Sequence, residues 1–216
     1  MTIKINPKCP EIELIKKVAL SLREGSLLIF PTDTVYGLGA NGLNPEAIGK
    51  LFEIKRRDKT KPFALLIGEI DDVYKCCKNI PPLFFTITKR FWPGAITVVL
   101  DAQEIIPKEA MGGGAGVALR MPDSNIALSL LREAGVPIAA SSANLSGGID
   151  PASVDEIEDE LMNGVDTVID GGKCLGIPST VVDLRGNVLK ILREGAISAA
   201  EINRVAYRKI DELEEL

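Results

Sequence analysis

The sequence of 216 residues contains no histidine. Histidine is the side chain whose ordinary pKa lies closest to neutral pH, so its absence excludes histidine general bases, Ser-His-Asp and Cys-His nucleophiles, and histidine metal ligands. Any catalysis must therefore depend on carboxylates, lysine, arginine, hydroxyl groups, backbone groups or an added metal ion. No other feature of the sequence excludes as many enzyme classes.

Aromatic residues are also scarce, at 5% of the chain, so few side chains are available to stack on single-stranded nucleic acid. The formal net charge is −5, which argues against bulk electrostatic binding to nucleic acid or to an anionic membrane. A local basic patch can still bind phosphate, because the field that acts on a bound anion is local.

The four cysteines form no C-x-x-C pair, and the adjacent Cys76 and Cys77 cannot easily bridge each other. We interpret all four as reduced thiols, which predicts a cytoplasmic protein. The first residues contain no apolar signal core, and no stretch reaches the roughly 18 apolar residues of a membrane span. We therefore expect no membrane association.

Composition and length predict one domain over residues 1–216. Apolar periodicity and turn signals predict helices at 11–24, 45–54, 82–91, 126–134, 154–162 and from 199. They predict strands at 26–30, 63–67, 95–100, 117–120, 136–140, 167–169, 180–184 and 188–192. Helices and strands alternate first and strands cluster later, which indicates the α/β class with a mixed sheet.

Polar side chains follow several of the predicted strands. Thr32, Asp33 and Thr34 follow the first buried strand, Arg120 ends another, and Ser142 and Asn144 end a third. Strand ends that converge in this way build the ligand crevice of an open α/β sheet. The sequence therefore predicts a site for a small polar molecule at these strand ends.

The segment 55–61 carries five basic side chains in seven positions. A solvated basic surface is one interpretation. The other is a triphosphate clamp, in which arginine supplies a planar fork of donors and lysine a mobile point charge. The sequence alone leaves both open.

Three further segments also allow two interpretations. Residues 141–148 are either an ordinary turn or a serine-rich cradle for phosphate, and Ser179 is either a strand start or a substrate contact. Gly112 to Gly116 lacks G-x-x-x-x-G-K-[ST] and precedes a strand, which favours a flexible loop over a nucleotide loop. Arg193, taken alone, is a surface charge.

Six segments in a fixed order resemble the motif series of the threonylcarbamoyl-adenylate synthase family, the YrdC/Sua5/TsaC type. They are Pro31–Leu38, Lys55–Arg57, Trp92–Gly94, Val117–Pro122, Ser142–Gly147 and Pro178–Val181. The resemblance covers about residues 10–200 and is closest to the short, single-domain type, without the C-terminal domain of longer Sua5-type members. It implies a twisted open α/β sheet with flanking helices around a deep, positively lined cavity.

The resemblance also implies the reaction. L-threonine, bicarbonate or CO₂ and ATP would form threonylcarbamoyl-adenylate and diphosphate, for N6-threonylcarbamoyl modification of adenosine 37 in tRNAs. It implies Mg²⁺ with the ATP, a downstream threonylcarbamoyl-transferase complex as partner, and possible contact with tRNA or double-stranded RNA. Because a carbamate is already an oxyanion nucleophile, this chemistry needs charge neutralisation and alignment instead of a histidine base.

The family's functional positions map onto this sequence by motif. By resemblance, Lys55 and Arg57 are catalytic, and the threonine contacts are Thr34, Arg120, Ala140 and Ser179. The ATP contacts implied in the same way are Lys55, Arg57, Lys61, Gly116, Ser142, Asn144, Asp150 and Arg193. The resemblance leaves the ligands of the metal ion unknown.

Three residues differ from patterns common in the family. Asp58 stands where a proline often follows the K-x-R motif. Leu66 stands where some members have a threonine-contacting histidine, and Asp150 stands where a serine near the nucleotide is frequent. Leu66 weakens one specific contact to threonine.

Two other functions are considered. One is a non-catalytic RNA-binding or ribosome-maturation protein of the same fold that uses the basic cavity. The other is a carbamoyltransferase module like that in hydrogenase maturation, which is disfavoured because its acylphosphatase and zinc-finger segments are not in this chain.

Overall fold

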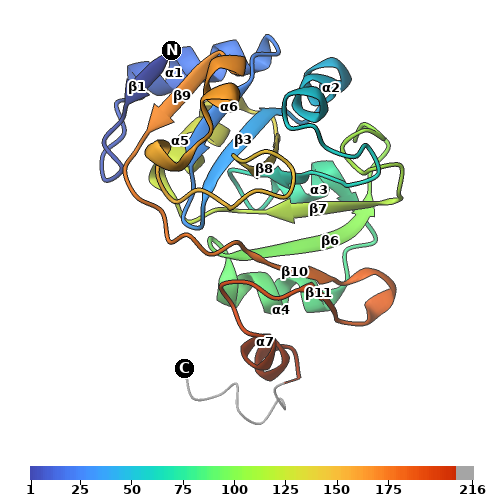
Figure 1. The fold of residues 1–216 in the computed structure, drawn as a ribbon. Coiled ribbons are helices and arrows are strands. Elements are labelled where there is room, and N and C mark those ends of the chain that lie inside the picture. The colour runs from blue at the N-terminus through green and yellow to red at the C-terminus, as the bar shows by residue number, and fades with distance from the viewer. Residues whose placement is uncertain (208–216) are drawn as a thin grey trace.

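Strands from nearly the whole length of the chain join in one twisted sheet (Figure 1). The structure is a computed structural model that describes residues 1–207. The sheet has eleven strands in the order β1-β9-β2-β3-β8-β4-β7-β6-β10-β11, with β5 paired to β6. The strands are β1 Thr2–Lys4, β2 Leu28–Pro31, β3 Tyr36–Asn41, β4 Ala64–Leu66, β5 Cys77–Lys78, β6 Ile96–Ala102, β7 Gly116–Arg120, β8 Ile138–Ser142, β9 Thr167–Asp170, β10 Thr180–Asp183 and β11 Lys190–Arg193.

The sheet is mixed and open, as predicted. Strands β2 and β9, β4 and β7, and β6 and β10 pair in parallel, whereas β2–β3, β3–β8, β6–β7 and β10–β11 are antiparallel. The antiparallel pairs β2–β3 and β10–β11 join consecutive strands, whereas β3–β8 joins strands about 100 residues apart, and the parallel pairs require a crossover connection. The α/β fold class is therefore confirmed.

Seven helices and two 3₁₀ turns lie among the described residues. They are α1 Ile12–Arg23, α2 Pro45–Ile54, α3 Asp72–Cys76, α4 Pro82–Phe91, α5 Asn125–Ala134, α6 Asp159–Gly164, α7 Ala199–Ala206, η1 Val154–Glu156 and η2 Arg185–Asn187. Within residues 1–207, none of these helices has the length and apolar character needed to cross a bilayer.

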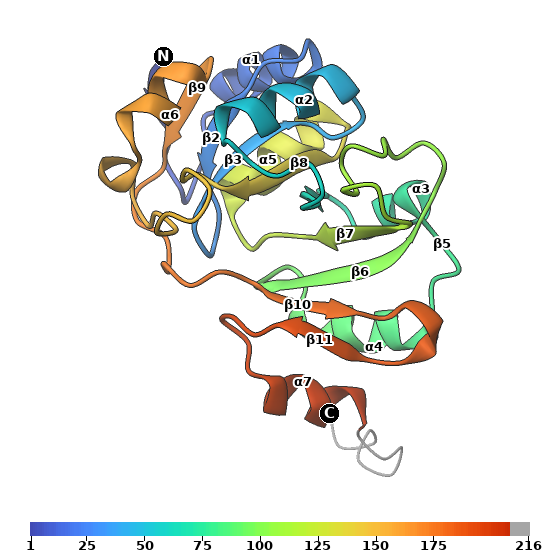
Figure 2. The same cartoon turned by 45° about the vertical axis from the view of Figure 1, so that its right-hand side comes forward.

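Helices α1 and α5 lie side by side over one face of the sheet (Figures 1 and 2). Leu22 of α1 and Leu130 of α5 are fully buried in one cluster with Leu28 and Phe30 of β2. Ile29, between those two strand residues, belongs to the other cluster, because successive side chains of a strand point to opposite faces. Strand β2 is therefore covered on both faces, which explains its unbroken apolar sequence.

The second buried cluster includes α2 and α4. Ile48 of α2 and Phe84 of α4 are fully buried, and so are Ile96 and Val98 of β6. Thr97 and Val99 alternate with these residues and therefore face the opposite way. Helices α4 and α7 lie beside each other at the β10–β11 end of the sheet (Figure 2).

Local signals located several elements correctly. Asn44 caps α2, since its side chain accepts hydrogen bonds from the backbone of Glu46 and Ala47, and Pro45 opens the helix. Helix α4 has the predicted bounds, and α1 differs from its prediction by one residue at each end.

The predicted helix at 154–162 is wrong. The 3₁₀ turn Val154–Glu156 is followed by extended backbone at Ile157 and Glu158, and α6 begins only at Asp159. Ile157 is 5% exposed, so burial of its side chain in the core accompanies the break in the helix.

Strand β3 was not predicted. Its sequence, Tyr36–Asn41, contains two glycines and no β-branched residue, so its strand propensity is low. It forms because both neighbours pair with it: β2 through Pro31 and Tyr36, and β8 through Gly39 and Ala140. The short elements β1, β5 and α3 were also missed.

Two leucines on α1 test this packing with the same chemical change. Leu22→Ala, at a fully buried position, is expected to lower the free energy of unfolding by about 2–5 kcal/mol because it leaves a cavity between α1 and the sheet. Leu20→Ala, at a position that is 51% exposed, should change it by less than about 1 kcal/mol. Urea unfolding followed by circular dichroism measures both, and equal losses would contradict the assigned burial.

Candidate functional site

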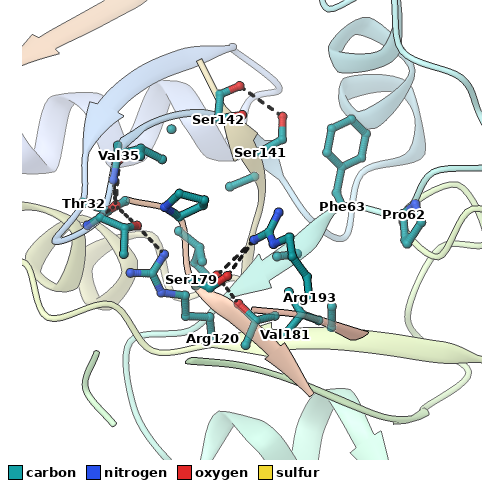
Figure 3. A pocket seen from close by; sticks show the side chains of 18 of the residues that line it. Thr32, Val35, Pro62, Phe63, Arg120, Ser141, Ser142, Ser179, Val181 and Arg193 are labelled. Atoms are coloured by element: carbon teal, nitrogen blue, oxygen red, sulfur yellow. Dashed lines mark hydrogen bonds between the residues drawn. The ribbon is translucent and has the colours of Figure 1, made fainter. Parts of the chain in front are cut away.

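A cavity of about 280 Å³ opens beside the strands of the sheet's second half (Figure 3). Strands β3, β4, β6, β7, β8, β10 and β11 all contribute to it, together with the loops before Phe63 and after Ser142. Its lining residues include Thr32, Thr34, Arg57, Phe63, Leu66, Thr97, Val99, Ala118, Arg120, Ala140, Ser142, Asp150, Ser179, Val181, Leu192 and Arg193. Residues far apart in the sequence therefore meet at one site.

Arg120, at the end of β7, is almost fully buried and is held by three acceptors. Its Nη2 donates to Oδ1 of Asp33 at 2.5 Å, Nη1 to Oγ1 of Thr34 at 2.8 Å, and Nε to the carbonyl of Gly94 at 3.0 Å. A buried guanidinium is tolerated only when it is paired and hydrogen-bonded. Within residues 1–207 three of its five N–H donors are used by these acceptors, which leaves two for a ligand.

The turn after β2, residues 32–35, holds the Thr34 hydroxyl that Arg120 contacts. Oγ1 of Thr32 donates to the carbonyl of Val35 at 2.7 Å and accepts from the backbone N–H of Thr34 and Val35. Its only proton is then used, so in the 3.0 Å contact between the two threonine hydroxyls Thr34 is the donor. The hydroxyl of Thr34 is thus fixed beside Arg120.

The turn at Trp92–Gly94, between α4 and β6, requires a glycine at residue 94. A Cβ at Gly94 would lie 2.6 Å from the carbonyl oxygen of Phe91, and the residue has a φ of +158°. Its N–H donates to the carbonyl of Met121 at 2.8 Å, while its own carbonyl accepts from Arg120. Glycine therefore permits a turn that is bonded both to Arg120 and to the residue after it.

Ser179 and Arg193 form the next part of the wall. The hydroxyls of Ser179 and Thr97 lie 2.8 Å apart, and Nη2 of Arg193 donates to the Ser179 carbonyl at 2.8 Å. The guanidinium of Arg193 points into the middle of the cavity, between Ser179 and Ser141 (Figure 3). Antiparallel pairing of Val181 with Arg193 brings the two strands into this register.

Arg57 supplies a second positive charge. Its Nε and Nη2 donate to the carbonyls of Lys61 and Pro62, and its guanidinium carbon lies 5.1 Å from the centre of the Phe63 ring. Burial and then the charge of Arg193 lower the pKa of Arg57. Two arginines that repel each other across a cavity form a site for an anion.

Lys55 lies behind the cavity wall. It is 2% exposed, and its Nζ donates to the carbonyl of Ser142 at 2.5 Å, the carbonyl of Asn144 at 2.6 Å and Oδ1 of Asn144 at 2.8 Å. All three ammonium donors are thereby used. Burial and then the charge of Arg57 lower the pKa of Lys55 to about 8.

The same contacts fix the loop after β8. Asn144 Oδ1 also accepts from the hydroxyl of Ser142 at 2.7 Å, and its Nδ2 donates to the carbonyl of Gly148 at 2.6 Å. Lys55 and Asn144 therefore position Ser142, which does line the cavity.

Eight of the residues implied by resemblance line the cavity: Thr34, Arg57, Arg120, Ala140, Ser142, Asp150, Ser179 and Arg193. Four do not line it: Lys55, Lys61, Gly116 and Asn144. Lys61 is exposed and contributes its carbonyl to Arg57. Gly116 opens β7, four residues before Arg120.

One functional candidate was missed from the sequence, Thr97. It is a polar residue within the buried strand β6, which is the signal that could have identified it. Leu66 lines the cavity as an apolar residue.

The cavity offers little to a metal ion on its own. Residues 1–207 contain no group of three or more acidic, cysteine or histidine side chains that could hold one. Asp150 is the single carboxylate among the residues that line the cavity. Such a site suits Mg²⁺ that enters bound to phosphates, because Mg²⁺ commonly takes one or two carboxylates and completes its shell with phosphates and water.

A family model described as Sua5/YciO/YrdC, telomere recombination, matches residues 21–195. The chain is 40% identical to the threonylcarbamoyl-AMP synthase of Pyrococcus abyssi, over 95% of this chain and 61% of that protein. It is 38% identical to the Bacillus subtilis enzyme of the same name, over 88% of this chain and 56% of that protein. The chain thus spans about three fifths of the length of these two relatives.

Shorter relatives match over most of their length. A putative threonylcarbamoyl-AMP synthase of Methanocaldococcus jannaschii is 35% identical over 89% of both chains. Among solved structures, P. abyssi Sua5 complexed with L-threonine superposes with a TM-score of 0.91 at 38% identity, over 95% of this chain and 60% of that one. E. coli YciO superposes with a TM-score of 0.85 at 26% identity, over 94% and 98%.

Motif order, fold and these matches agree, and the resemblance found in the sequence is confirmed: the chain belongs to the Sua5/YciO/YrdC family.

Proposed function

We propose that this protein is a threonylcarbamoyl-AMP synthase, which joins L-threonine, bicarbonate and ATP into threonylcarbamoyl-AMP and diphosphate. The observation that carries the proposal is the single cavity in which a buried, oriented Arg120 lies at one end and Arg57 and Arg193 lie beyond it. The names of the relatives support this enzyme over the RNA-binding alternative.

Threonine binds at the Arg120 end in this proposal. The two remaining N–H donors of Arg120 suit a carboxylate, which accepts a guanidinium fork in bidentate fashion. The hydroxyl groups of Thr34 and Ser179 lie on the same wall and can meet the polar groups of the amino acid. Ala140 and Leu66 provide a small apolar surface for the threonine methyl group.

The nucleotide phosphates bind beside Arg57, Arg193 and Ser142. The threonine amine nitrogen forms a bond to the carbon of bicarbonate, a C–O bond of bicarbonate breaks, and water leaves, which gives a carbamate. The anionic oxygen of this carbamate attacks the α-phosphorus of ATP. A bond from that oxygen to phosphorus forms, the bond from phosphorus to the β-phosphate bridge breaks, and diphosphate leaves. The arginines neutralise the two anions and align them, so no proton need be removed in this step.

Lys55 is a positioning residue in this scheme, because its donors are directed to the loop that carries Ser142. Mg²⁺ would arrive with ATP, with Asp150 as the available protein carboxylate, and would supply further neutralisation of phosphate charge. The product would serve threonylcarbamoyl modification of tRNA in the cytoplasm, by transfer through a downstream complex.

A direct assay tests the activity. Protein incubated with ATP, threonine and ¹³C-bicarbonate should release diphosphate and form a ¹³C-labelled threonylcarbamoyl-AMP detected by mass spectrometry. Arg57→Met should lower turnover about 100- to 1,000-fold, because a fixed donor at a developing charge is typically worth that much. Arg90→Met, at an exposed arginine paired with Glu201, is the matched control and should keep full activity. Diphosphate release that persists without threonine would contradict the proposal.

Asp33→Asn tests the orientation of Arg120. The change keeps the shape of the side chain but removes the charge that holds Nη2, so we expect the KM for threonine to rise roughly tenfold to a hundredfold. The KM for ATP should change much less, because the ion pair of Asp33 is made with Arg120 and not with Arg57 or Arg193. Asp123→Asn, at an exposed position, serves as control. An unchanged KM for threonine in folded Asp33→Asn protein would remove Asp33 from the site.

The pKa of about 8 for Lys55 predicts a pH dependence of ATP binding. Below pH 8 the ammonium keeps three donors for the loop at Ser142, and as the pH rises through 8 it loses one of them. ATP affinity, measured by calorimetry, should therefore fall between pH 7 and pH 9. Lys55→Met should bind ATP more weakly at pH 7 and show no such decline. A flat profile for the wild-type protein would show that Lys55 does not titrate in this range.

A further inference from the structure

The sheet face that forms the cavity floor continues beyond the residues that line it. Along β7, Arg120 and Ala118 line the cavity, and Gly116 is the next residue on the same face. Along β6, Thr97 and Val99 line it, and Asp101 follows. Register pairs Ala118 with Val99 and Gly116 with Asp101, so the two strands continue the face together.

Polarity changes in order along this face. Arg120 and Thr97 lie at one end, with Val181 paired to Thr97, and Val99 and Ala118 form the next, apolar pair. Four residues of strand, about 13 Å, separate Arg120 from Gly116. An apolar floor beyond the cationic groups suits the uncharged part of a nucleotide, which is its base.

Arg185 lies at the far end of this floor. A Cβ built on Gly116 would lie 2.6 Å from Nη1 of Arg185, 2.9 Å from its Cζ and 3.0 Å from Cγ1 of Val99. The guanidinium therefore occupies the space above Gly116 and next to Val99, and it does so because residue 116 has no side chain.

Asp183 fixes that guanidinium in place. Nε donates to both carboxylate oxygens at 3.0 and 3.2 Å, and Nη2 donates to Oδ2 at 2.7 Å. The side chain of Asp183 is 11% exposed and that of Arg185 is 37% exposed, so the arginine is anchored on one edge and open on the other. Nη1 donates to no acceptor in the part of the chain that the structure describes.

We propose that Arg185 is a specificity-determining residue that contacts the base of the nucleotide, with Nη1 donating to an acceptor on the base edge. The inference rests on the proposed function, because it assumes that a nucleotide binds with its phosphates at Arg57 and Arg193. The base then lies over Val99 and Ala118, with Arg185 as the end wall.

Calorimetry with ATP and with inorganic tripolyphosphate separates base recognition from phosphate binding. In the full-length protein, Arg185→Met should weaken ATP binding roughly tenfold to a hundredfold, the range of a hydrogen bond to a charged group, and leave tripolyphosphate binding unchanged. Arg132→Met is the matched control, since Arg132 is also a surface arginine held by one carboxylate, Glu69, and should leave both affinities unchanged.

A second variant tests the same placement from the other side. Gly116→Ala puts a methyl group where the guanidinium now lies, so it should displace Arg185 and weaken ATP binding in the same selective way. ATP affinity that is unchanged in Arg185→Met, or lost equally with tripolyphosphate, would overturn the inference and leave the proposed function intact. Wild-type protein that binds neither ligand would overturn both.

Discussion

The buried guanidinium of Arg120 is the constraint on which the site depends. An arginine that is 6% exposed requires charge and hydrogen-bond compensation, and it obtains both from segments that lie far apart in the sequence. Asp33 and Thr34 come from the turn between β2 and β3, and the Gly94 carbonyl comes from the turn before β6. One side chain thereby fixes the relative positions of the turn, β7 and the loop after α4.

The pair Arg57 and Arg193 has different electrostatics from Arg120. Arg57 and Arg193 lie close enough to repel each other, and Asp150 is the one carboxylate among the lining residues. Concentrated positive charge costs stability in the free protein and is relieved when an anion binds, as is common for sites built for function. Lys55 has a structural role instead. Its ammonium group donates to three oxygen acceptors in the loop after β8 and thereby fixes the conformation of that loop.

The sequence predicted those features that depend on local residue patterns. Asn44 and Pro45 located α2, and polar residues at strand ends identified Arg120, Ser142 and the turn after β2. It missed β3, whose glycine-rich sequence becomes a strand only because β2 and β8 pair with it. It also assigned Lys55 to the phosphates by resemblance, whereas the hydrogen bonds of its Nζ to Ser142 and Asn144 depend on tertiary contacts 87 and 89 residues away in sequence. Such long-range partners have no signature in a single sequence.

The topology of the sheet has a consequence for how the molecule is made. Strand β1, at residues Thr2–Lys4, pairs with β9, and the last cavity residue, Arg193, stands on the final strand. A chain emerging from the ribosome therefore cannot close its first strand into the sheet until residues 167–170 have appeared, and the anion site lacks an arginine until β11 is complete. The apolar face of α1 likewise lacks its partner α5 until residues 125–134 have appeared, and contacts between such distant segments carry a loop-closure cost. Assembly of the anion site therefore follows the synthesis of β11 and its pairing with β10.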